Sequence, residues 1–97
     1  MERQERRDSP RNRIDCAMSF RLAGKDVSHE GFCINISGSG VLFEADDPLT
    51  TGTAVEIHLV PQRGVAAPLT AFIEVVRCVA TDAGPYRIAG AIKGIKS

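Results

Sequence analysis

The chain has 97 residues, which is enough for one domain with a small hydrophobic core. It carries 12 basic and 12 acidic side chains, so its formal net charge is zero, and this balance argues against a general affinity for DNA or RNA. No apolar run approaches the roughly 20 residues that cross a bilayer, and the polar, arginine-rich start does not resemble a signal peptide. We therefore expect a cytoplasmic protein that does not insert into membranes.

The first 13 residues differ in composition from the rest of the chain. They contain no aliphatic or aromatic side chain after Met1, and they hold five arginines: Arg3, Arg6, Arg7, Arg11 and Arg13. A segment of this kind cannot bury itself. We therefore expect residues 1–13 to form a flexible N-terminal arm and residues 14–97 to form the folded domain.

The rest of the chain has the pattern of short strands separated by turns rich in Gly, Pro and Asp. Apolar and polar side chains alternate from Ile14 to Leu22, and the same period of two returns at Val55, Ile57 and Leu59. The predicted strands cover residues 14–22, 27–36, 41–45, 55–59, 69–80 and 86–95. Helical periodicity is absent over any useful length. The pattern predicts an all-β, six-stranded antiparallel barrel, because closure removes exposed edges in a domain this small.

Three of these strands carry more specific expectations. In the second strand, three apolar residues are expected on one face: Phe32, Ile34 and Ile36. The fifth strand is apolar on both faces over residues 72–76, which predicts that its outer side is partly covered. In the sixth strand, Gly90 and Gly94 predict a bend or a close approach of two backbones.

An Arg-x-x-x-Arg pair, formed by Arg7 and Arg11, lies just before the first predicted strand, with Arg6 beside it. A planar guanidinium can hold a phosphate through two parallel hydrogen bonds and can also stack on a base. The pair is therefore suited to clamp a nucleotide from two sides.

An Asn-x-Ser-x-x-Gly pattern lies between the second and third predicted strands. Asn35 offers a hydrogen-bond donor and an acceptor, and Ser37 offers a hydroxyl. Gly40 either adopts a backbone conformation closed to other residues or lets the backbone approach a ligand.

In this order, the two motifs resemble those of the PilZ domain family. The surrounding segments are similar as well, and the resemblance runs from about Arg6 to Ile95. It implies a six-stranded antiparallel barrel that binds the bacterial second messenger cyclic di-GMP and signals to a downstream protein partner. It assigns the ligand to six residues: Arg6, Arg7, Arg11, Asn35, Ser37 and Gly40. It implies no further cofactor and no catalytic residues.

Other interpretations of the sequence remain open. A protein of the same fold would act as an interaction adaptor if it bound no nucleotide. A barrel that binds single-stranded nucleic acid would need basic grooves with interleaved aromatic residues, and the chain has four Phe, one Tyr and no Trp. An enzyme is not expected, because His29 and His58 are isolated. The three cysteines contain no C-x-x-C pair, so no metal site is predicted. Whether Arg77 contacts the ligand is also left open.

Overall fold

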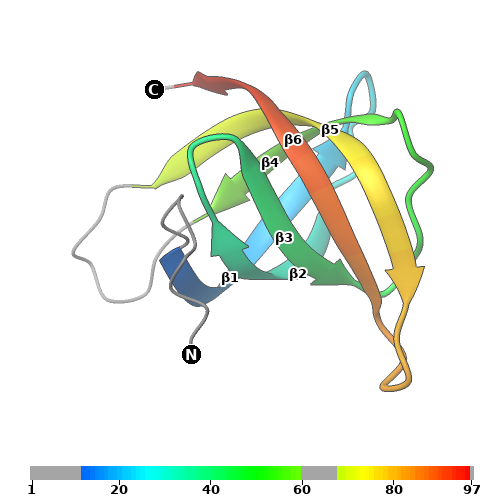
Figure 1. The fold of residues 1–97 in the computed structure, drawn as a ribbon. Helices are drawn as coiled ribbons and strands as arrows, with labels where there is room; N and C mark the ends of the chain where they lie inside the picture. Colours follow the sequence, from blue (N-terminus) through cyan, green and yellow to red (C-terminus); the bar gives the residue numbers. More distant parts are fainter. Residues whose placement is uncertain (1–11, 60–67, 97) are drawn as a thin grey trace.

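The computed structural model of this chain describes residues 12–59 and 68–96, with the backbone alone for residues 12–16. Its strands are β1 (Asn12–Leu22), β2 (His29–Ile36), β3 (Gly40–Ala45), β4 (Ala54–Leu59), β5 (Leu69–Ala80) and β6 (Tyr86–Lys96). All six pair antiparallel and close into a barrel in the order β1-β2-β3-β6-β5-β4 (Figure 1). The predicted six-stranded antiparallel barrel is confirmed, and its predicted strand bounds differ from these by at most two residues.

The inner faces of the strands supply the core. Met18, Phe20, Val55, Ile57 and Leu59 are buried, as the period-two pattern predicts. Phe43, Ile73 and Ile88 are among the largest of the fully buried side chains. Each such side chain contributes about 1.5–3 kcal/mol when it leaves water. No polar or charged side chain is buried among the residues whose side chains the structure describes, so the described core is apolar.

The second strand departs from the predicted alternation because it contains a β-bulge. Cys33 pairs with Phe43, but Asn35 pairs with Leu42, so Ile34 is an extra residue on β2. Phe32 is 43% exposed and lies outside, while Ile36 packs against the core. The prediction that these apolar residues share one face is therefore wrong, since a bulge reverses the alternation beyond it.

A second bulge lies in β5. Val75 pairs with Gly90 and Arg77 pairs with Ala89, which leaves Val76 as the extra residue. The predicted cover over the outer side of this strand is wrong, because Phe72 is 43% exposed and Val76 is 52% exposed. The apolar run over residues 72–76 is therefore explained by a bulge, and its outward-facing apolar side chains are exposed to solvent.

Gly90 lies where a side chain would not fit. A Cβ atom placed there would lie 2.6 Å from Ile73 Cδ1, so the close contact at this glycine is with a side chain, whereas the prediction was an approach of two backbones. Gly94 has open space around it and lies beside a register shift between β5 and β6. Across residues 12–59 and 68–96, no helix has the length and apolar character needed to cross a membrane.

Candidate ligand-binding site

The turn between β2 and β3 is held by Ser37. Its backbone N–H donates to Gly40 O at 2.9 Å. Its hydroxyl oxygen accepts from the N–H groups of Gly40 and Ser39 at 3.3 and 3.4 Å. The sequence motif assigned this hydroxyl to the ligand, and the contacts in the structure also give it a part in the turn. A serine followed by glycines between two strands was the available signal, since such hydroxyls commonly bond the backbone of their own turn.

Gly40 lies where β3 comes close to the backbone of β6. Among the described glycines, only Gly24, Gly52 and Gly84 have a positive φ, so the expectation of an unusual backbone conformation at Gly40 is wrong. A Cβ atom at this position would lie 3.3 Å from the carbonyl oxygen of Gly90 on β6. A larger residue would push β3 and β6 apart next to the turn.

Asn35 lies on the outer face of the barrel because of the bulge at Ile34. Its register partner, Leu42, lies between the buried Val41 and Phe43, so the Asn35–Leu42 pair is on the side away from the core. Regular alternation from the buried Cys33 would have directed Asn35 inward. The Asn35 side-chain amide is half-buried and makes no hydrogen bond with any described residue. Its donor and acceptor are thus available to a ligand.

The predicted arginine clamp, formed by Arg6, Arg7 and Arg11, lies outside the described residues. The point where the arm joins the barrel is described, however. Asn12 pairs with Ile36, and the backbone of Arg13 pairs with that of Asn35. The N-terminal end of β1 therefore lies beside the end of β2, and the chain enters the barrel next to the Asn-x-Ser-x-x-Gly turn.

The outer face next to Asn35 continues as a row of paired residues across four strands. Asn35 on β2 is followed by Leu42 on β3, Ala89 on β6 and Arg77 on β5. Figure 1 shows β3, β6 and β5 side by side on this wall. The neighbouring row contains Glu44 and Arg87, and the two side chains form an ion pair at 2.7 Å.

Away from this wall, Arg21 on β1 pairs with Glu56 on β4. The hydrogen bond from Arg21 is the main cause that lowers the pKa of the Glu56 carboxyl below its usual value, and the same contact raises the pKa of Arg21. Lys96 Nζ also lies 3.9 Å from Glu56. These contacts connect β1 and β6 with β4 on the outer surface.

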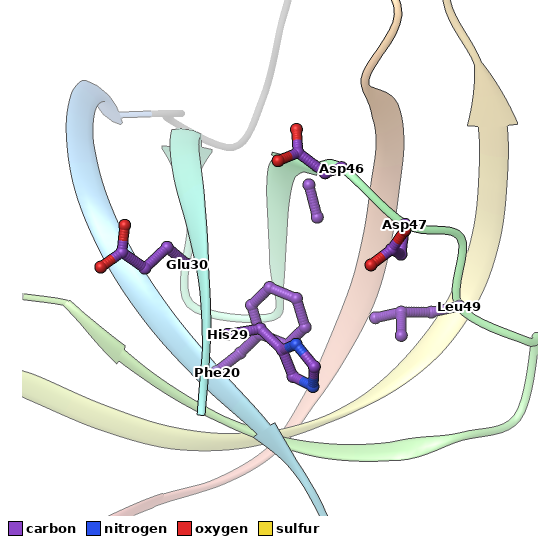
Figure 2. Close-up of a pocket in the computed structure, with 7 residues that line it drawn as sticks. Phe20, His29, Glu30, Asp46, Asp47 and Leu49 are labelled. Atoms are coloured by element: carbon purple, nitrogen blue, oxygen red, sulfur yellow. The ribbon is translucent and has the colours of Figure 1, made fainter. Parts of the chain in front are cut away.

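A shallow pocket of about 160 Å³ lies near the beginning of β2 and the end of β3, away from the turn. It is lined by Phe20, His29, Glu30, Ala45, Asp46, Asp47 and Leu49 (Figure 2). The His29 ring stacks on Phe20 at 5.3 Å, and His58 contacts Thr70 at 2.8 Å. In the described ranges, no three His, Cys, Asp or Glu residues gather as metal ligands do. Both histidines thus have structural contacts.

Comparisons with known proteins agree with this fold. The chain matches the sequence profile of the PilZ domain over residues 5–95. Among solved structures it is similar to the inhibitor of motility MotI/DgrA of Bacillus subtilis, with a TM-score of 0.73 and 15% sequence identity. That similarity covers 99% of this chain and 46% of the other, so this chain spans about half of that protein's length. No curated protein sequence matches the chain.

Proposed function

This chain belongs to the PilZ domain family, and on that premise we propose that it is a receptor for cyclic di-GMP. Domains of this family are in general binding modules that respond to cyclic di-GMP and are not enzymes. The observation that carries the proposal is the outward amide of Asn35, which has no partner among the described residues and lies where the arginine-rich arm enters the barrel.

The ligand chemistry suits the proposed site residues. Cyclic di-GMP carries two phosphate charges and two guanines. Arg7 and Arg11 would hold phosphate oxygens or the O6/N7 edge of guanine, with Arg6 as a helper. The Asn35 amide would bond the edge of a guanine, Ser37 would keep the turn in shape, and Gly40 would keep β3 close to β6.

The arm gives the proposed receptor a means of signalling. Because Asn12 and Arg13 already pair with β2, only the residues before them would be ordered over the ligand, at a cost of about 1 kcal/mol or more per residue. This cost favours micromolar over nanomolar affinity. A segment ordered in this way presents a new surface beside the barrel. We infer that a downstream protein, in the cytoplasm, recognises this surface.

Calorimetric titration of the whole chain with cyclic di-GMP tests the proposal, with GTP and cyclic GMP as control ligands. Wild type should bind cyclic di-GMP alone, and the variants Arg7→Ala and Arg11→Ala should bind at least about tenfold more weakly. Lys25→Ala is the control, because it removes one positive charge from a turn away from the site. Wild-type protein that shows neither heat of binding nor thermal stabilisation at ligand concentrations in the hundreds of micromolar would refute the receptor function.

One observation favours a second candidate, a protein-interaction adaptor that binds no nucleotide. Phe72, Val76 and Val79 all lie on β5 and are 43%, 52% and 49% exposed. Apolar side chains gathered on one strand in this way are typical of a surface that a partner covers. The same titration separates the two functions, since an adaptor of this kind would not bind cyclic di-GMP.

A further inference from the structure

We propose that Arg77 is a further anchor for the ligand and holds the end of cyclic di-GMP that lies farthest from Asn35. This inference rests on the proposed function and deepens it. It defines a binding strip on the outer wall of the barrel that runs from Asn35 on β2 to Arg77 on β5.

Strand register places the two polar residues at opposite ends of one row. Asn35 pairs with Leu42, Leu42 with Ala89, and Ala89 with Arg77. Three steps between neighbouring strands, at about 4.8 Å each, separate the two ends by roughly 14 Å. A flexible arginine side chain shortens the gap that a ligand must span.

Both ends of the strip depend on a bulge. Val75 on β5 is buried, so regular alternation would direct Arg77 toward the core. The extra residue Val76 reverses that direction, as Ile34 does for Asn35 on β2. Bulges re-aim side chains, and here the two bulges turn the polar ends of a single row to the same outer surface.

The floor between the two ends is low and apolar. Leu42 and Ala89 form it, and Gly40 and Ala91 lie opposite each other in the next outward row. On β3 and β6 a flat purine would meet Leu42 and otherwise only glycine and alanine. Glu74 on β5 ends the row of Gly40 and Ala91, and it forms an ion pair with Lys93 at 3.6 Å. The ion pair between Glu44 and Arg87, in the row on the other side, keeps those two charges engaged with each other.

Arg77 lacks a carboxylate partner in the part of the chain that the structure describes. There, Arg21, Arg87, Lys93 and Lys96 each form an ion pair with a glutamate. Arg77 and Lys25 are the described basic side chains that form none, and Lys25 lies in the turn after β1. The Arg77 guanidinium is therefore available for a phosphate or for the O6/N7 edge of a second guanine.

The test is a calorimetric titration of the whole chain with cyclic di-GMP, using wild type, Arg77→Ala, Arg77→Lys and the control Lys25→Ala. Arg77→Ala should bind about tenfold more weakly, and Lys25→Ala should bind like wild type. Retained binding in Arg77→Lys assigns the contact to a phosphate. Lost binding in Arg77→Lys assigns it to guanine, since lysine cannot form the bidentate pair.

An Arg77→Ala variant that binds as tightly as wild type overturns the inference while the receptor function stands. Wild type that does not bind overturns both. An independent measurement follows the backbone amides of Leu42 and Ala89 by NMR during titration of the wild type. Their resonances should shift on addition of cyclic di-GMP, and resonances that stay in place while the Asn35 amide moves also contradict the proposed strip.

Discussion

Asn35 and Ser37 are two residues apart, yet the described fold uses only one of their side chains. The Ser37 hydroxyl contacts two backbone N–H groups of its own turn. The Asn35 amide makes no hydrogen bond to the described residues. If the chain binds cyclic di-GMP as proposed, loss of binding in a serine variant would report on the shape of the turn, whereas loss of binding in an asparagine variant would report on the proposed ligand contact.

Replacement of Ser37 by alanine should lower the free energy of unfolding by about 0.5–1 kcal/mol. The hydroxyl would no longer accept its long hydrogen bonds from two N–H groups of the turn or donate one to Gly40 O. Urea denaturation followed by circular dichroism measures the change. Ser28→Ala is the matched control, since Ser28 is exposed and bonds to no described residue. Equal stability of the two variants would show that the hydroxyl does not hold the turn.

At the scale of the strands, periodicity predicted most of the fold. Val55, Ile57 and Leu59 point inward as the alternation requires. The predicted faces are wrong in β2 and β5, at the bulges formed by Ile34 and Val76. An extra residue cannot be recognised from the composition of a strand, and it reverses the faces of the residues that follow it. Those two positions also direct the candidate site residues outward. The sequence motif therefore named Asn35 as a candidate site residue. The residues beside it on the outer surface could be found only from the strand register.

Packing between β5 and β6 depends on the absence of a side chain at Gly90. The variant Gly90→Ala places a Cβ atom 2.6 Å from Ile73 Cδ1, and such overpacking should cost about 1–3 kcal/mol. Combining it with Ile73→Val, which removes that methyl group, should cost less than the sum of the two single variants in a double-mutant cycle.

The control for this cycle is Gly94→Ala, which places its methyl group in open space on the same strand. It should leave the unfolding free energy within about 0.5 kcal/mol of wild type. Additive effects of Gly90→Ala and Ile73→Val would contradict the proposed clash.

At the scale of the whole molecule, the barrel closes where β1 meets β4, and the Arg21–Glu56 ion pair crosses that seam. The pair lowers the pKa of Glu56 in the folded state from its usual value of 4.5. Its stabilisation is therefore fully present above the unfolded-state pKa and is lost as the pH falls through the lower folded-state pKa. Arg21 stays charged throughout this range.

Thermal melts of wild type and Glu56→Gln measure this effect from neutral to acidic pH. Wild type should be the more stable at neutral pH, by a small margin because the pair is exposed to solvent. The difference should shrink as the pH falls below 4.5. A difference that is constant with pH would show that the carboxylate charge does not contribute to closure.

The bulge at Ile34 has a consequence for the length of the chain. The extra residue on β2 counts differently toward the two neighbouring strands. Toward β3, β2 has one residue too many between Cys33 and Asn35, whereas toward β1 it has one too few, because residues 14 and 15 both lie between the partners of this pair. Deletion of Ile34 would therefore restore the register with β3 and widen the mismatch with β1. A gap at this point of β2 is expected only together with a gap at residues 14–15 of β1.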